Sequence, residues 1–220
     1  MTADFAIIFD MDGVIVDSNP YHKVALKQFV RKYGRDLTDQ ELLQKVYGRT
    51  NKEWLTNLFG VLSTEQLHRY TEEKEELYRA LFKNEIRPLK GLVTFLEALE
   101  QYHIPRAIAT SAPHSNVTFT LDGTGTRNYF KVILDDTFVT HGKPNPEIYV
   151  KAAAALHMPP AQCIVFEDSL SGVQSGQAAG ARVVGVTTTH SPEELAHTNY
   201  VINDFADLDP LLLFRKIFAK

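Results

Sequence analysis

The sequence has little of several features that would point to particular classes of protein. Its single cysteine, Cys163, cannot form an internal disulfide, and it lies in the apolar run CIVF, where we expect a buried inert thiol rather than a nucleophile. No segment approaches the roughly 18 uninterrupted apolar residues of a membrane span, and the N-terminus lacks the features of a signal peptide. These absences exclude a disulfide framework and predict a cytoplasmic protein with no membrane partner.

The charge of the chain gives no sign of a polyanionic partner. The 220 residues carry a formal net charge of −4, the isoelectric point is about 6.1, and no basic run stands out. Nucleic acid is therefore not an expected partner. With 44% hydrophobic and 23% charged residues, the chain should bury one sizeable core plus a smaller module, and we expect a monomer.

Short apolar runs alternate with helical patterns over most of the chain. The runs are rich in β-branched residues and end in polar ones, which predicts buried strands at Ala6–Phe9, Arg106–Ala109, Val132–Leu134, Cys163–Phe166, Arg182–Val186 and Tyr200–Ile202. Helices are expected between them at Leu92–Gln101, Asn116–Leu121, Glu147–Leu156, Leu170–Ala179 and Glu193–Ala196. This alternation predicts an α/β fold with a doubly wound parallel sheet covered on both faces.

The region from Tyr21 to Glu85 interrupts that alternation. It contains four helical patterns and no convincing strand, with helices expected near Tyr21–Tyr33, Thr38–Val46, Asn51–Phe59 and Thr64–Asn84. Pro88 and Gly91 mark the return to the sheet. We therefore predict a core domain of residues 1–16 and 88–220 and an inserted α-helical domain of residues 17–87.

Two aspartates follow the first predicted strand, in the stretch AIIFDMDGVIVDS. Residues i and i+2 of an extended segment face the same side, so the carboxylates of Asp10 and Asp12 can converge. Two like charges that close require a cation or a shared proton. An ordinary turn would explain one aspartate there, but not a pair.

Polar residues also follow the other predicted strands, at the edge where ligands of such sheets bind. Thr110 and Ser111 come after the second strand, Lys143 follows the third within HGKPNPEIY, and Glu167 and Asp168 follow the fourth. Singly, each has a structural explanation as a turn residue, a helix cap or a solvated charge. Together they supply carboxylates for a cation, and a hydroxyl and a lysine for an anion, which are the parts of a phosphoryl-transfer site.

The predicted helix after Asp168 carries Gly172, Gly176 and Gly180 at four-residue spacing, on one face. A glycine-rich nucleotide loop is the alternative, but glycine lowers helix stability unless backbones must approach closely. We interpret this face as close packing of the helix against the sheet.

Four motifs carry a family resemblance over essentially the whole chain. FDMDGVIVDS, IATS, KPNPEIY and VFEDSLSGVQSG resemble, in order and spacing, the motifs of the haloacid dehalogenase superfamily, and specifically its β-phosphoglucomutase-like phosphatase branch. The resemblance implies a Rossmann-like core with a helical cap inserted after the first strand. It also implies Mg²⁺-dependent phosphoryl transfer from a small phosphorylated metabolite through an aspartyl phosphate.

The same resemblance implies roles for the matching residues. Asp10 would attack phosphorus, Asp12 would donate and accept the proton, and Thr110 and Lys143 would bind the phosphoryl oxygens. Mg²⁺ prefers oxygen ligands in near-octahedral geometry. The expected ligands are Asp10, the main-chain carbonyl of Asp12, Asp168 and, directly or through water, Glu167.

Substrate recognition is expected from the cap and from the loops at the edge of the sheet. Ser18 and His22 resemble positions that face the substrate in this branch, with a helix N-cap and a surface histidine as the alternatives. Arg49 and Thr50, in YGRTNKEW, lie in a turn suited to holding a second anionic group, although a solvated arginine is the alternative there. Ser111 completes the expected substrate contacts.

Three functional hypotheses follow. The first is a Mg²⁺-dependent phosphatase acting on a small phosphorylated metabolite such as a sugar phosphate. The second is a β-phosphoglucomutase, but typical members have a lysine and an arginine where this chain has Tyr47 and Asn51, which weakens that reading. The third, from another class, is an inactive regulatory binding protein on the same fold, against which the full set of motif residues argues.

Overall fold

The computed structural model describes residues 4–45 and 51–218. The chain divides into two compact units, which we call the core unit, Met1–Asp17 with Arg87–Lys220, and the cap unit, Ser18–Ile86. The core unit contains the sheet, whereas the described part of the cap unit is helical. That these units act as a catalytic domain and a substrate-selecting cap remains a prediction. None of the helices in the described ranges combines the length and apolar character needed to cross a membrane.

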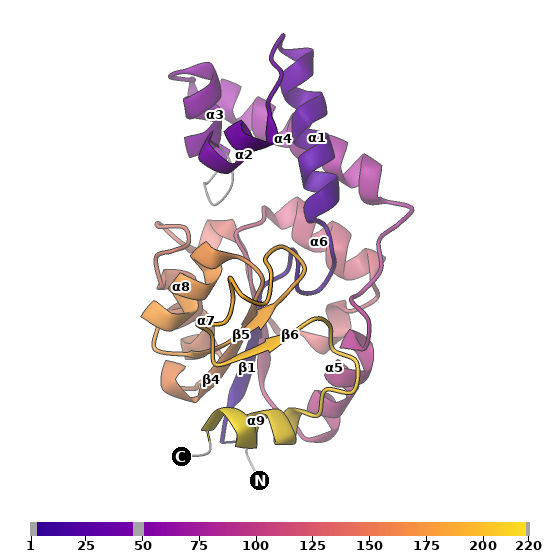
Figure 1. Ribbon diagram of the computed structural model, residues 1–220, viewed down its shortest axis with the longest axis vertical. Helices are drawn as coiled ribbons and strands as arrows, with labels where there is room; N and C mark the ends of the chain where they lie inside the picture. The colour runs from indigo at the N-terminus through magenta and orange to yellow at the C-terminus, as the bar shows by residue number, and fades with distance from the viewer. Residues whose placement is uncertain (1–3, 46–50, 219–220) are drawn as a thin grey trace. The chain divides into compact units, whose positions relative to one another are not determined.

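Six parallel strands form the sheet of the core unit (Figure 1). They are β1 Ala6–Phe9, β2 Arg106–Ala109, β3 Val132–Leu134, β4 Cys163–Glu167, β5 Arg182–Val186 and β6 Tyr200–Ile202. Their order is β3-β2-β1-β4-β5-β6, so the direction of winding reverses between β1 and β4. This confirms the predicted α/β doubly wound sheet, and in sheets of this kind ligands bind beyond the carboxyl ends of the strands at such a reversal, here those of β1 and β4.

Helices cover both faces of this sheet (Figure 1). The helices of the core unit are α5 Leu92–Gln101, α6 His114–Gly123, α7 Glu147–Ala155, α8 Leu170–Ala178 and α9 Pro210–Phe218, with 3₁₀ turns at Arg127–Tyr129, Asp136–Phe138 and Pro160–Gln162. Ile8 and Val165 face α7 and α8, whereas Phe9 and Phe166 stack at 5.2 Å and pack against Phe95 of α5 on the opposite face. Burial on both faces explains why these strands read as continuous apolar runs.

One helix prediction for the core unit was wrong, and one helix was not predicted. The expected helix at Glu193–Ala196 is a series of turns, although Ser191 and Glu194 form the reciprocal hydrogen bonds that usually begin a helix. Asn199 then pairs with the backbone of Val183, which draws the chain into β6 before a helix can extend. The sequence analysis also missed α9, whose Phe214 stacks on Phe5 at 4.4 Å.

The cap unit has an apolar core of its own. Its helices are α1 Asn19–Lys32, α2 Asp39–Lys45, α3 Asn51–Phe59 and α4 Thr64–Phe82. Phe29 of α1 packs edge-on against Trp54 of α3 at 6.0 Å, within a cluster that includes Leu26, Leu55 and Leu58. Because this cluster is formed by cap residues alone, the inserted helices have an independent reason to pack together.

Candidate active site

Three segments that are distant in sequence converge at the carboxyl ends of β1 and β4. Lys143 Nζ lies 2.6 Å from Asp10 Oδ1 and 2.6 Å from Glu167 Oε1, and it also donates to the carbonyl of Ala109 at 3.3 Å. Lys143 and Asp10 are 133 positions apart in the chain. The main-chain N–H of Asp10 donates to the carbonyl of Phe166, so strand pairing continues into the site and fixes the backbone of Asp10.

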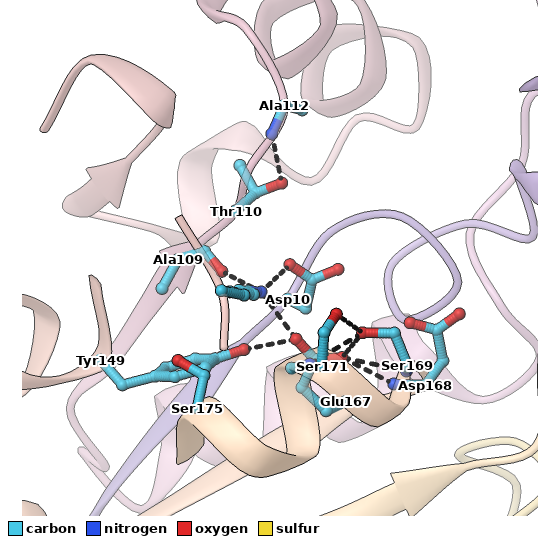
Figure 2. A network of polar contacts seen from close by, with 12 residues as sticks. Asp10, Ala109, Thr110, Ala112, Tyr149, Glu167, Asp168, Ser169, Ser171 and Ser175 are labelled. Atoms are coloured by element: carbon cyan, nitrogen blue, oxygen red, sulfur yellow. Dashed lines mark hydrogen bonds and ion pairs between the residues drawn. The ribbon is translucent and has the colours of Figure 1, made fainter. Parts of the chain in front are cut away.

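Glu167 is fully buried, and both of its carboxylate oxygens accept hydrogen bonds (Figure 2). Oε1 accepts from Lys143 Nζ and from the hydroxyl of Tyr149 at 2.7 Å. Oε2 accepts from the main-chain N–H groups of Asp168 and Ser169 and from the Ser169 hydroxyl. These hydrogen bonds fix the Glu167 carboxylate beside the Lys143 ammonium. Tyr149, its second partner at Oε1, was not predicted from the sequence.

The glycines of α8 explain how Glu167 fits beneath this helix. A Cβ at Gly172 would lie 1.7 Å from Oε1 of Glu167, and a Cβ at Gly176 would lie 2.9 Å from a methyl group of Val183. Both glycines therefore allow close packing of α8 on the sheet. At Gly172 the group that packs against the helix is the charged side chain of Glu167. Gly180 differs from the expectation, because α8 ends at Ala178 and Gly180 supplies a left-handed backbone with φ of +86°.

Carboxylates outnumber the cation in this cluster. Oxygens of Asp10, Glu167 and Asp168 lie within 4.8 Å of one another, and all three residues are buried beside one lysine. Burial raises the pKa of Asp10 well above its usual value, despite the Lys143 ammonium. Burial and the neighbouring Glu167 charge raise the pKa of Asp168 to about 8. A cation with a preference for oxygen ligands would remove this repulsion, so the cluster is suited to bind a divalent metal ion.

Lys143 and Glu167 stay charged in these surroundings. Burial alone would lower the pKa of Lys143, but Asp10 and Glu167 raise it above its ordinary value. Burial alone would raise the pKa of Glu167, but Lys143 and the hydrogen bonds from Tyr149 and Ser169 hold it below its ordinary value. The pair therefore places a fixed ammonium beside Asp10 at neutral pH.

Thr110 and Ser111 lie where the sequence predicts them, directly after β2. Thr110 is buried, its N–H donates to the carbonyl of Leu134, and its hydroxyl accepts from the N–H of Ala112 at 3.1 Å. A hydroxyl that accepts in this way retains its own proton for donation to a ligand oxygen. Ser111 is exposed in the turn that leads into α6.

Asp12 lies in a tight turn after β1. The N–H of Gly13 donates to the carbonyl of Val16 at 2.7 Å, and the positive φ of Gly13, +76°, explains why glycine follows the aspartate. Among the described residues, the group of close carboxylates does not include Asp12. Binding of a metal ion by the main-chain carbonyl of Asp12 stays a prediction.

His22 belongs to a second polar cluster, inside the cap unit. Its Nδ1 lies 3.0 Å from Nζ of Lys74, which in turn lies 3.0 Å from Glu75 Oε1, and its ring stacks on Tyr78 with centroids 3.6 Å apart. His22 is thus held in place rather than solvated on the surface. Lys74 and Glu75 were not predicted as part of a site, because the surrounding run EEKEEL is typical of an exposed charged face of a helix. In the structure both residues are buried.

Three further residues of the cap unit were predicted to contact substrate. Ser18 occupies the N-cap position of α1, but its hydroxyl makes no capping hydrogen bond. Arg49 and Thr50 lie outside the described residues. The roles of all three in substrate binding stay predictions.

Comparisons with known proteins agree with this fold and site. The family model for haloacid dehalogenase-like hydrolases matches residues 7–186. A phosphorylated carbohydrates phosphatase of Thermotoga maritima is 32% identical over 183 residues, which cover 82% of this chain and 84% of that protein. A β-phosphoglucomutase of Bacillus subtilis is 30% identical over 191 residues, which cover 82% of each.

Solved structures extend the likeness to the whole described fold. A haloacid dehalogenase-type hydrolase of family IA, variant 3, from Entamoeba histolytica has a TM-score of 0.89 and 31% identity, and the match covers 97% of this chain and 99% of that one. The match thus includes both the sheet and the helical insertion. Together with the buried acidic cluster, these similarities show that the chain is an enzyme of the haloacid dehalogenase-like hydrolase family, in its β-phosphoglucomutase-like phosphatase branch.

Proposed function

We propose that the chain is a Mg²⁺-dependent phosphatase that hydrolyses a small phosphorylated carbohydrate through an aspartyl phosphate on Asp10. The observation that carries this proposal is the contact of Lys143 with both Asp10 and Glu167, within a cluster that has more carboxylates than cations. Such a site combines an oxygen nucleophile, a place for a divalent ion and a fixed positive charge. The names of the relatives, which include a phosphatase of phosphorylated carbohydrates, support the substrate class.

The oxygen donors of the site fit Mg²⁺. We assign Asp10, Asp168 and the main-chain carbonyl of Asp12 as its direct ligands. Glu167 would act through water, since each of its oxygens already accepts hydrogen bonds from protein groups. The ion would supply Lewis-acid stabilisation of the charge that develops on the phosphoryl oxygens.

The reaction consists of two displacements at phosphorus. A carboxylate oxygen of Asp10 attacks, the bond to the sugar oxygen breaks, and Asp12 donates a proton to that oxygen. Water then attacks the aspartyl phosphate, Asp12 takes its proton, and inorganic phosphate leaves as Asp10 is regenerated. Lys143 and the hydroxyls of Thr110 and Ser111 would bind the transferring oxygens throughout.

The proton-transfer role of Asp12 has its own test. An Asp12→Ala variant should lose about 10²–10⁴-fold in turnover, which is the usual contribution of general acid–base catalysis. The loss in kcat/KM, which reports the first displacement alone, should be smaller for a substrate with a good leaving group, such as p-nitrophenyl phosphate, because that group needs no proton in the first step. Equal losses in kcat/KM for both kinds of substrate would remove the role of general acid from Asp12.

The residues of the cap favour a phosphatase, which transfers the phosphoryl group to water, over a mutase, which transfers it back to a sugar hydroxyl. A mutase must hold a bisphosphorylated intermediate by its distal phosphate, which requires a strong cationic clamp. Asn51 is neutral, and its side-chain oxygen accepts a hydrogen bond from the indole of Trp54 at 2.8 Å. We assign Ser18, His22, Arg49 and Thr50 to substrate recognition, with Arg49 as the cationic anchor.

The test is a comparison of products. β-Glucose 1-phosphate is supplied with Mg²⁺ and glucose 1,6-bisphosphate, beside a panel of hexose, pentose and hexitol phosphates, and inorganic phosphate and glucose 6-phosphate are measured together. We expect phosphate release from some member of the panel and little glucose 6-phosphate. Isomerisation that clearly outpaces phosphate release would establish the mutase instead. Binding of phosphate esters with no turnover of any of them would favour a regulatory binding protein.

A further inference from the structure

Three consecutive threonines follow β5, and each hydroxyl contacts a different part of the core unit. Thr187 donates to the side chain of Asn203 at 2.8 Å. Thr188 donates to the main-chain carbonyl of Gly13 at 2.6 Å, across 175 positions of sequence. Thr189 donates to Oδ2 of Asp168. The segment therefore reaches from β5 past β4 to the loop that follows β1.

The backbone of this segment is fixed at both ends. At its start, the N–H of Thr187 donates to the carbonyl of Ile202, which continues the pairing of β5 with β6. Just after its end, Ser191 and Glu194 exchange hydrogen bonds at 2.9 and 3.3 Å. Because the main chain of this segment is constrained at both ends, the hydroxyls of Thr188 and Thr189 can hold Gly13 and Asp168 in place.

We propose that Thr189 is a positioning residue for Asp168 in metal binding, and that Thr188 holds the loop containing Asp12 and Gly13 in register with it. The inference rests on the metal site of the proposed function. A hydrogen bond to Oδ2 restricts rotation of the Asp168 carboxylate, so that the other oxygen is presented to the cation. Carboxylates that bind metals commonly need such a partner, and its removal weakens metal affinity by about 10–100-fold.

Core packing does not account for Thr189. The residue is exposed, and its hydroxyl is directed to a carboxylate that lies in the acidic cluster. Removing a hydroxyl from an exposed threonine should leave the fold and its stability nearly unchanged. A change in metal affinity can therefore be separated from a change in folding.

The experiment measures Mn²⁺ binding to the substrate-free protein, from the electron paramagnetic resonance signal of the unbound ion. Thr189→Val, which keeps the shape but loses the hydroxyl, should weaken binding by about 10-fold or more. Thr189→Ser should restore it, because the donor returns. Thr187→Val is the matched control, since its hydroxyl contacts Asn203 rather than the site, and it should bind as the wild type does.

Kinetics provide a second measurement. The Mg²⁺ concentration for half-maximal activity should rise for Thr189→Val by the same factor, while turnover at saturating Mg²⁺ recovers. Wild-type affinity in Thr189→Val, or equal weakening in Thr189→Ser, would overturn the role of the hydroxyl. If the wild type itself binds no Mn²⁺, the metal site of the proposed function fails, which is a different outcome from failure of this inference alone.

Discussion

Both units of the molecule bury a lysine beside carboxylates, but the balance of charge differs. In the core unit, Lys143 faces Asp10 and Glu167 at 2.6 Å each, with Asp168 in the same cluster. Among the described residues of the cap unit, Lys74 pairs with one carboxylate, Glu75, at 3.0 Å. The core cluster is left with excess negative charge, whereas the lysine and glutamate of the cap neutralise each other.

This difference in charge balance indicates which of the two buried clusters requires a bound cation. A buried charge without compensation is strongly unfavourable, so the carboxylates of the core need either protons or a cation. Burial raises the pKa of Asp10 well above its usual value and that of Asp168 to about 8, which is the direction expected for carboxylates that lack enough compensating positive charge. In the described part of the cap unit, Lys74 and Glu75 pair as one positive and one negative charge, so this pair does not call for a bound cation. The role of His22 in substrate affinity stays a prediction.

The largest effect on turnover is expected from replacing Asp10, the proposed nucleophile of the core cluster. Asp10→Asn should lower turnover by about 10⁴-fold or more, on the scale seen when a nucleophile is removed, because an amide neither attacks phosphorus nor binds Mg²⁺ well. The fold should persist, since asparagine has nearly the same size as aspartate and Lys143 retains its ion pair with Glu167. Phosphate release and circular dichroism test this, with the exposed Asp4→Asn as control. Activity within 10-fold of the wild type would exclude covalent catalysis by Asp10.

Removing each lysine in turn compares the two clusters directly. Lys143→Met should lower the free energy of unfolding by about 3–5 kcal/mol, because it leaves buried carboxylates unpaired. Lys74→Met should lower it by about 1–3 kcal/mol, since the buried Glu75 loses its ion pair with Lys74. Urea denaturation with and without Mg²⁺ is the measurement. Mg²⁺ should stabilise Lys143→Met more than the wild type, and Lys74→Met by the wild-type amount; equal Mg²⁺ effects in both variants would contradict the charge argument.

The raised pKa of Asp168 predicts how stability depends on pH without metal. Between its ordinary value of 3.8 and its folded value of about 8, the folded protein holds a proton that the unfolded chain releases. Unfolding is therefore favoured as pH rises, and the free energy of unfolding should fall between about pH 5 and pH 8 in EDTA. Mg²⁺ should reduce this slope, because the ion takes the place of the proton.

Two variants test this pH dependence. Asp168→Asn should show a smaller decline in EDTA, since it removes one of the carboxyls whose pKa is raised, whereas Asp4→Asn, which changes an exposed aspartate of the same unit, should keep the wild-type slope. A stability that rises over this range in EDTA would contradict the prediction.

The smallest effect is expected from the cap. His22→Ala should raise KM by about 10-fold and change kcat less, the pattern expected when binding is lost without loss of chemistry. Loss of the stacked contact with Tyr78 should also lower stability by about 1 kcal/mol. Initial rates over a range of substrate concentrations provide the measurement, and His68→Ala, an exposed histidine of the same unit, is the control. A fall in kcat at unchanged KM would move His22 from recognition to chemistry.

Patterns within single segments account for what was predicted correctly. All six strands were located, because parallel strands buried on both faces are short apolar runs that end in polar residues. The same reasoning located Asp10, Thr110, Lys143 and Asp168, since each follows a strand at the edge where ligands bind. It missed α9, and it predicted a helix at Glu193–Ala196 where a local helix start is overridden by the pairing of Asn199 with Val183.

Partners that are distant in sequence could be identified only in the folded chain. The sequence placed Lys143 and Glu167 at one edge of the sheet, but the order of the strands brings β4 beside β1 and the lysine between two carboxylates. The threonines after β5 were not singled out in the sequence, because the contact of Thr189 with Asp168 depends on β5 lying beside β4.

The composition and strand-end motifs of this chain were enough to predict its fold class and its family, and to name the buried carboxylates and the lysine that the structure brings together. The excess charge of that site, the complete hydrogen bonding of Glu167 under Gly172, and the buried cluster around His22 were determined by packing. The physical reason is that periodicity reports the environment of each residue along its own segment. Burial of a charge and the identity of its partner depend instead on which segments the sheet and the helices bring together.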